Sequence, residues 1–331
     1  MNLSRMLSAT AVVALLQGCA AQPPSVPQTA TEPGMLVVGG GRFTMGRDKG
    51  EINERPSHKV AVDTFAMDRT EVSADEFAMF LNAVGNADAV YFTPDEYATV
   101  VVAPTADGRK ETRFSARPGY ERHPANNISW KGADAYCRWR GKRLPSEAEW
   151  EKAARGTDKR LFPWGNRNPG SGLAQFEQVW QEKLFNVLVP VDDLPEGASP
   201  YGMLNMAGNV LEWVNDWYRQ NLCDFCNPEK EANLELILQL TGRDTAPPDA
   251  GHAGNAQAVE DAQGNAKNKR QTPPRNNPSG PTAGIFKVLR GGSWQDRLDD
   301  DLSTTHRFWL DPAQRFPHTG FRCSQQSSRQ P

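Results

Sequence analysis

The chain has 331 residues and a formal net charge of −3, with 28 glycines, 25 prolines and nine tryptophans. A near-neutral charge without a basic stripe argues against nucleic acid as a partner. This content of Gly, Pro and Trp is typical of a loop-rich globular fold rather than a helical bundle. About 300 residues beyond the N-terminal segment suffice for one large domain or two small ones.

The N-terminal segment has the pattern of an export signal. Arg5 precedes an apolar run, residues 6–16, that is too short to span a bilayer and suits a signal-peptide core. The run ends in Leu16-Gln17-Gly18-Cys19, which resembles the bacterial lipobox, where the cysteine is lipidated. Gln17 is unusual there, so cleavage by the ordinary signal peptidase is the alternative. We expect residues 1–19 to be a signal peptide with a lipobox and Cys19 to be lipidated.

Residues 20–34 are rich in Pro, Ala, Gln and Thr and predict an extended, flexible tether. Ala20 stands where an aspartate usually retains a lipoprotein at the inner membrane. We therefore expect the chain in the periplasm, anchored to the outer membrane. A triacylated cysteine can hold a globular domain there. No later run is long and apolar enough to cross a membrane, so the lipid is the only expected membrane contact.

Four stretches carry strand signals. Residues 36–46 predict two short strands around a glycine turn, and residues 59–68 alternate as one half-buried strand. Residues 186–191 and 286–289 are also strand-like. These stretches supply the β part of the chain.

Three segments carry helix signals. Ser73 and Glu76 form a capping box, which predicts that a helix begins there. A second helix is expected to start near Ser129. A third starts at Ser146 with another capping box and ends at Gly156.

Two later stretches predict no packed structure. Residues 245–283 are rich in Pro, Gly, Asn, Gln and Ala and have almost no large apolar side chains. Such a segment cannot bury enough surface to fold alone, so we expect a disordered insertion. The last residues, 325–331, are polar and predict a frayed tail.

A series of motifs, in order along residues 36–324, is shared with one enzyme family. The motifs are Gly40–Gly46, Pro124–Trp130 leading to Ala135–Cys137, Gly141–Glu151, Phe162–Asn166, Tyr201–Trp213, Val288–Trp294 and Gly320–Cys323. With these motifs the chain resembles the formylglycine-generating enzyme, or sulfatase-modifying factor, family. The resemblance implies one α+β domain over residues 35–324, with a loop-rich, C-type-lectin-like fold and little regular secondary structure.

The resemblance also identifies a departure at the reaction centre. Enzymes of the family oxidise a sulfatase cysteine with Cu(I) and O2, and two cysteines five positions apart hold the copper. Those positions are Asp296 and Asp301 here. Cu(I) prefers thiolates, whereas carboxylates prefer hard cations, so we do not expect the copper oxidase activity. Leu211 also replaces a tryptophan that the family usually has near the reaction centre, while Ser293 is retained.

The loop around the two aspartates is strongly acidic. Asp299 and Asp300 add their charge to Asp296 and Asp301, close to Ser293. One interpretation is a solvated acidic loop, because charge runs are usually only solvated. The other is a recognition patch for a basic peptide or a divalent ion. These five residues are the binding site that the sequence predicts.

The resemblance implies a structural calcium ion at a second loop. The family's ligands match side-chain oxygens of Asn205 and Glu212 and backbone carbonyls of Gly208 and Val210. Such mixed oxygen ligands suit calcium; the alternative is a plain turn. The family's other calcium loop would fall in residues 166–190, but the sequence departs from the pattern there and that site is not carried over.

The cysteines fit an oxidising compartment. Cys137 and Cys323 match family positions that are joined by a disulfide. Cys223 and Cys226 form a lone CxxC, for which a local disulfide is favoured over redox activity.

The five histidines are scattered, so the three-histidine iron site of the ergothioneine-type relatives is not expected. His306 and His318 lie in the segment that faces the former active site and stay functional candidates.

Two functions are compatible with these observations. The first is a non-catalytic envelope binding or regulatory protein, whose partner is an envelope protein or peptide. Periplasmic members of the family act this way in type VI secretion. The second is a periplasmic oxidoreductase or maturation factor with a non-copper mechanism, as in the pyoverdine-maturation branch. The two aspartates at the copper positions favour the first.

Overall fold

The computed structural model describes residues 34–103, 112–179, 187–220 and 275–326. The predicted signal peptide, the lipidated Cys19, the tether up to residue 33, Cys223 and Cys226 lie outside these ranges, as do most of the predicted insertion and residues 327–331. Among the described residues, the helices are too short or too polar to cross a membrane.

The three predicted helices are confirmed. They are α1 (Ala74–Val84), α2 (Trp130–Trp139) and α3 (Glu147–Arg155). Ser73, Ser129 and Ser146 each cap a helix by accepting a hydrogen bond from a backbone N–H of the first turn, and α1 and α3 have complete capping boxes. Short 3-10 turns occur at η1 (Ile52–Glu54), η2 (Ala87–Ala89), η3 (Pro195–Gly197) and η5 (Asp299–Leu302).

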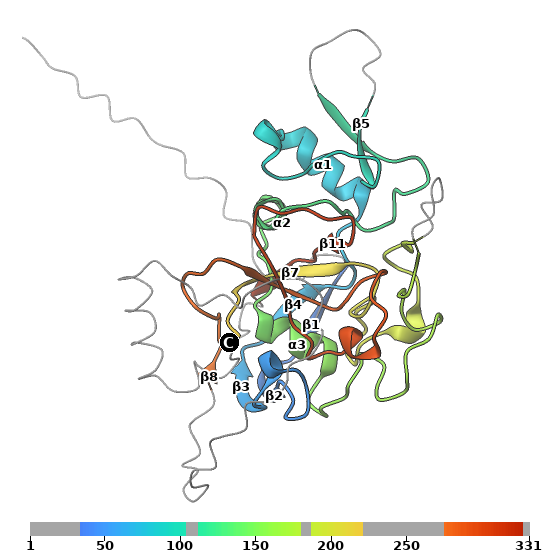
Figure 1. The fold of residues 1–331 in the computed structure, drawn as a ribbon. Helices are drawn as coiled ribbons and strands as arrows, with labels where there is room; N and C mark the ends of the chain where they lie inside the picture. Colours follow the sequence, from blue (N-terminus) through green and yellow to red (C-terminus); the bar gives the residue numbers. More distant parts are fainter. Residues whose placement is uncertain (1–33, 104–111, 180–186, 221–274, 327–331) are drawn as a thin grey trace, which may run out of the picture. The chain divides into compact units, whose positions relative to one another are not determined.

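The strands of the described residues form small sheets of two to four strands (Figure 1). Their orders are β1-β4-β12, β10-β9-β7-β11, β2-β3-β8 and β5-β6. The strands are β1 (Met35–Val38), β2 (Gly41–Met45), β3 (His58–Val62), β4 (Phe65–Asp68), β5 (Val100–Ala103), β6 (Arg113–Ala116), β7 (Leu211–Trp217), β8 (Arg275–Asn276), β9 (Lys287–Arg290), β10 (Phe308–Leu310), β11 (Thr319–Gly320) and β12 (Ser324–Gln326). The expected α+β, loop-rich architecture is therefore confirmed.

Several sequence-based boundaries were wrong. Residues 59–68 form two strands, β3 and β4, which belong to different sheets. The described part of the 186–191 stretch, residues 187–191, has no strand. The end of the predicted insertion is ordered, because β8 pairs in parallel with β3. The polar tail starts later than expected, since Gln325 and Gln326 pair with β4 in β12. For β8 and β12, pairing with a distant strand decides the structure.

The four-stranded sheet has an apolar core on each face. Along β7, Trp213 belongs to the cluster packed around α1 and α2, whereas Val214 belongs to the cluster packed around α3 and β2. Leu289 and Val288 of β9 divide in the same way. Successive side chains of a strand point to opposite faces, so this sheet joins the two cores. The loop after β9 starts from this central position.

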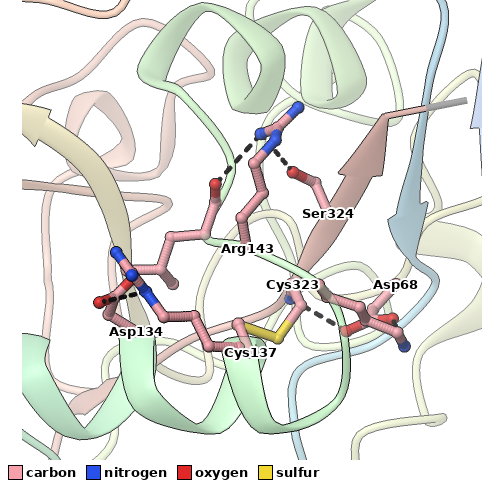
Figure 2. Close-up of a disulfide and its surroundings, with 9 residues drawn as sticks. Asp68, Asp134, Cys137, Arg143, Cys323 and Ser324 are labelled. Atoms are coloured by element: carbon pink, nitrogen blue, oxygen red, sulfur yellow. Dashed lines mark hydrogen bonds and ion pairs between the residues drawn. A yellow bond between two sulfur atoms is a disulfide. The ribbon is translucent and has the colours of Figure 1, made fainter. Parts of the chain in front are cut away.

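A disulfide joins α2 to the C-terminal segment, as the resemblance predicted. Cys137 and Cys323 are bonded, with their Cα atoms 5.6 Å apart and a sequence separation of 186. Figure 2 shows Asp68 beside the bridge. The Asp68 carboxylate accepts hydrogen bonds from the Cys323 backbone N–H, at 2.9 Å, and from Lys142 Nζ, also at 2.9 Å. The bridge is thus packed into a network of polar contacts.

Candidate functional site

The loop after β9 contains the two positions that match the family's copper cysteines. It begins at Gly291 and Gly292, which have positive φ angles of 100° and 70°. A Cβ atom at Gly292 would lie 2.9 Å from the carbonyl oxygen of Asp301. The start of the loop therefore packs directly against its end, and Gly292 permits this contact because it has no side chain.

Asp296 closes a tight turn within this loop. One carboxylate oxygen, Oδ2, accepts a hydrogen bond from the Ser293 backbone N–H at 2.6 Å and one from Ser293 Oγ at 2.9 Å. Burial raises the pKa of Asp296, the bond from Ser293 opposes that rise, and the nearby charge of Asp301 adds to it. Ser293, which the family retains, is thus hydrogen-bonded to Asp296, which stands at the first copper position.

Asp301 faces an imidazole on the same loop. His306 Nε2 lies 3.8 Å from Asp301 Oδ1, and His306 Nδ1 lies 3.4 Å from Glu54 Oε1. Burial raises the pKa of Asp301, and the charge of His306 opposes this effect. His306 is therefore flanked by one carboxylate of its own loop and by that of Glu54, which is distant in the sequence. His318, the other histidine candidate, instead stacks on Phe316 with ring centroids 5.2 Å apart.

Glu54 connects the loop to the segment around η1. Its fully buried side chain accepts hydrogen bonds from Arg47 Nε at 2.5 Å and from Thr305 Oγ1 at 2.7 Å. Burial raises the pKa of Glu54, but interactions with His306, Arg47 and Thr305 outweigh it and lower the pKa to about 2. Sequence reasoning missed Glu54, because it lies 251 positions from Thr305 and no local spacing pairs them.

The remaining acidic residues of the predicted patch are exposed. Asp299 and Asp300 are both exposed in η5, and Arg47 Nη1 lies 3.2 Å from Asp300 Oδ1. All five predicted binding residues lie on one loop, where they have three different arrangements. Ser293 and Asp296 close the loop, Asp301 faces His306, and Asp299 and Asp300 present negative charge to solvent.

The predicted calcium loop is compact and largely buried. Gly208 has a φ of 78°, and a Cβ there would lie 2.4 Å from the Gln175 carbonyl oxygen. Asn205 Nδ2 donates to Glu71 Oε2 at 3.1 Å, while its Oδ1 is buried without a hydrogen-bond partner in the structure. A buried amide oxygen without a donor fits a hard cation.

Glu212, the predicted carboxylate ligand, does not fit that role as it is arranged. Arg322 holds it through two bonds, Nε to Oε2 at 2.7 Å and Nη2 to Oε1 at 2.6 Å, and Trp150 Nε1 donates to Oε2 at 2.8 Å. Both oxygens are therefore neutralised by a buried guanidinium. The carboxylate beside the Asn205 and Asn209 amides is Glu71 instead. Calcium binding at this loop stays a prediction. The role of the Gly208 and Val210 backbone carbonyls as ligands is part of that prediction.

Burial controls the charge of Glu71. Burial raises its pKa to about 8; the charge of Arg322 opposes the rise and that of Glu212 adds to it.

Across residues 34–103, 112–179, 187–220 and 275–326, no group of three or more His, Cys, Asp or Glu side chains is arranged to hold a metal ion.

Comparison with known proteins places the chain in a family. The sulfatase-modifying factor enzyme 1-like domain matches residues 20–327. The chain belongs to that family, as its motifs predicted, and is a divergent member of it.

Individual relatives carry different names. The serine/threonine-protein kinase Pkn1 of Chlamydia caviae is 29% identical over 291 residues, which are 88% of this chain and 37% of that protein. The formylglycine-generating enzyme of Bos taurus is 36% identical over 233 residues, 59% of this chain and 62% of that enzyme. The chain therefore spans less than two thirds of either relative.

A solved structure has the same fold. PvdO from Pseudomonas aeruginosa superposes with a TM-score of 0.57, covering 92% of this chain and all of that one at 21% identity. At this identity the likeness shows the fold and no shared activity.

Proposed function

We propose that this chain is a non-catalytic envelope binding or regulatory protein that uses the loop of residues 293–306 to engage a protein or peptide. The observation that carries the proposal is the state of the two copper positions. Asp296 is bonded to Ser293 and Asp301 faces His306, so carboxylates stand where Cu(I) needs thiolates. The fold supports binding without the metal, because binding needs shape and complementary charge.

The exposed carboxylates favour a basic partner. Asp299 and Asp300 present their charge to solvent, and Arg47 contacts only the second of them. Attraction between exposed charges is screened by salt, so association with a Lys- or Arg-bearing peptide should weaken as ionic strength rises. An envelope partner in type VI secretion is one candidate. Affinity capture from envelope extracts, repeated at low and high salt, would identify the partner.

A turnover assay beside a binding assay tests the proposal. The full chain, supplied with copper and O2, should not convert a sulfatase-type cysteine peptide to formylglycine. Restoring cysteine at both positions by Asp296→Cys and Asp301→Cys would not suffice, because Leu211 also departs from the family. Formylglycine formed at a copper-dependent rate by the unaltered chain would sink the proposal.

One observation favours the alternative, an oxidoreductase or maturation factor with a non-copper mechanism. His306 lies between the carboxylates of Glu54 and Asp301, and an imidazole so placed can accept or donate a proton. This reading predicts a redox-active metal or cofactor in the protein purified from its own envelope. Metal analysis and an absorption spectrum of that preparation would test it, with His306→Gln as the variant that should change the spectrum.

Localisation and calcium are separate proposals. The mature protein should begin at a lipidated Cys19, and mass spectrometry of the N-terminal peptide is the test.

Calcium at the 205–212 loop is supported by the unpartnered Asn205 Oδ1 and opposed by the Glu212–Arg322 pair. A chelator that lowers the melting temperature, with recovery on adding calcium but not magnesium, would establish the site; an unchanged melting curve would refute it.

A further inference from the structure

The segment that joins β8 to β9 passes over β7 and is held at both ends. At its first end, Asn277 Oδ1 accepts a hydrogen bond from the Asp63 backbone N–H at 2.7 Å, and Asn277 Nδ2 donates to Asp63 Oδ2 at 3.1 Å. At its other end, the Phe286 carbonyl oxygen accepts a hydrogen bond from the Tyr218 backbone N–H at 2.8 Å. Residues 277–286, here called the strap, contain no ionisable side chain.

The middle of the strap lies directly on a buried carboxyl group of β7. A Cβ atom at Gly280, which has a φ of 68°, would lie only 3.0 Å from Asp216 Oδ1. Glycine permits both this φ and this close approach, because it has no side chain. Asp216 itself is only 4% exposed. The backbone of the strap therefore helps to keep water away from the Asp216 carboxyl group.

Asp216 also closes the start of α3, where its Oδ2 accepts a hydrogen bond from the Glu147 backbone N–H at 2.8 Å. The charged groups that face it are Glu147 and Glu149 on α3 and Lys287 on β9. Burial, and then the charges of the two glutamates, raise the pKa of Asp216 to about 7, against the bond from the Glu147 N–H and the charge of Lys287. Asp216 therefore keeps a proton at pH values where an exposed aspartate has lost it.

We propose that the strap is a proton-controlled latch, which a neutral Asp216 keeps closed and an ionised Asp216 opens. The strap offers the carboxylate no positive charge, so the ionised group is better stabilised by water, which reaches it when the strap moves away. A carboxyl group whose pKa is higher in the closed form than in the open form releases its proton on opening. The closed form is therefore favoured at low pH and is lost as the pH rises from 3.8, the ordinary value, toward about 7. The latch lies outside the loop of residues 293–306 and does not depend on what that loop binds.

Hydrogen exchange of the full chain, measured from about pH 5 to about pH 8, tests the latch. At each pH the protection factor of the strap is obtained against the same peptide in isolation, which removes the intrinsic pH dependence of exchange. We expect this factor to fall at least about tenfold between pH 5 and pH 7, because ionisation of Asp216 favours the open strap. Asp216→Asn keeps an oxygen for the Glu147 N–H but cannot ionise, so it should give a high protection factor at every pH. Gly280→Ala should lower the factor already at pH 5, because the added Cβ atom meets Asp216.

Glu71→Gln is the matched control, because it removes another buried carboxyl group whose pKa is raised. Its strap should lose protection with pH as the unaltered chain does. A flat profile in the unaltered chain, the same fall in Asp216→Asn, or a fall that disappears in Glu71→Gln would overturn the latch. Unchanged protection in Gly280→Ala would overturn it as well, since the strap would then not rest on Asp216. If circular dichroism shows that Gly280→Ala is unfolded, the comparison of Asp216→Asn with the unaltered chain decides alone.

Discussion

Two neighbouring regions use the same charged residue types in opposite ways. In the buried ion network around α3, the carboxylates of Glu147 and Glu151 are held by Arg290, Arg307 and Arg155. In the adjoining loop, Asp299 and Asp300 are exposed. Burial raises the pKa of Glu147, yet the charges of Arg307 and Arg290 prevail and keep it below its usual value. The network is a fixed part of the fold, while the loop has charge available for a partner.

The comparison shows where a family fold can diverge. Removing one partner of a buried ion pair leaves an uncompensated charge, so the network can change only as a whole. Exposed charges face no such constraint, because single surface substitutions usually alter stability little. The positions that hold copper in the family lie on the loop and not in the network, so they can be replaced while the scaffold persists.

The largest loss of stability should come from the disulfide that closes the scaffold. Replacing Cys137 and Cys323 by alanine should lower the free energy of unfolding by about 5 kcal/mol in the chain-entropy model, since the bridge joins residues 186 positions apart. Urea unfolding of the double variant measures this loss. A change below about 1 kcal/mol would mean that the polar contacts around Asp68 hold the C-terminal segment without the bridge.

The next effect should come from the Glu212–Arg322 pair. Glu212→Ala leaves the fully buried Arg322 guanidinium without its carboxylate and should cost about 3–5 kcal/mol. The double variant Glu212→Leu with Arg322→Met should recover much of that loss, because it removes both charges together. Repeating the measurement with a chelator separates this ion pair from calcium. A loss seen only when calcium is present would assign Glu212 to the metal.

A smaller effect, dependent on pH, is expected at Glu71. Its folded-state pKa is about 8 against an ordinary value of 4.5, so the folded chain binds an extra proton between these values. Stability from this group is complete below about pH 4.5 and is lost as the pH rises toward 8. Glu71→Gln should remove this dependence and be more stable than the unaltered chain by ~2 kcal/mol at pH 8. Parallel pH profiles of the two proteins, measured by urea unfolding, would contradict the assignment.

The sequence predicts the local parts of this structure far better than the long-range ones. Ser73 and Ser146 mark their helices because a capping box is complete within four residues. Residues 59–68 look like one strand because the alternation of apolar and polar residues does not change where the chain passes from the sheet of β3 to the sheet of β4. The family motifs bring Asp296 and Asp301 together on one loop. Glu54 and Arg47 could not be predicted there, since their contacts depend on packing between distant segments.

The smallest effect on stability, and the sharpest test of the comparison, is expected at the tip of the loop. Asp299→Asn and Asp300→Asn should each change the free energy of unfolding by less than ~0.5 kcal/mol, because both carboxylates are exposed. The same variants should weaken binding of an Arg-bearing peptide and flatten its salt dependence, since each removes one screened charge. Glu96→Gln, which removes an exposed carboxylate outside the loop, is the matched control and should change neither. A loss of stability above about 2 kcal/mol would place these aspartates in the ion network rather than on a free surface. Unchanged peptide binding with unchanged stability would show instead that the acidic loop is only solvated, and the charge difference between the two regions would then carry no function.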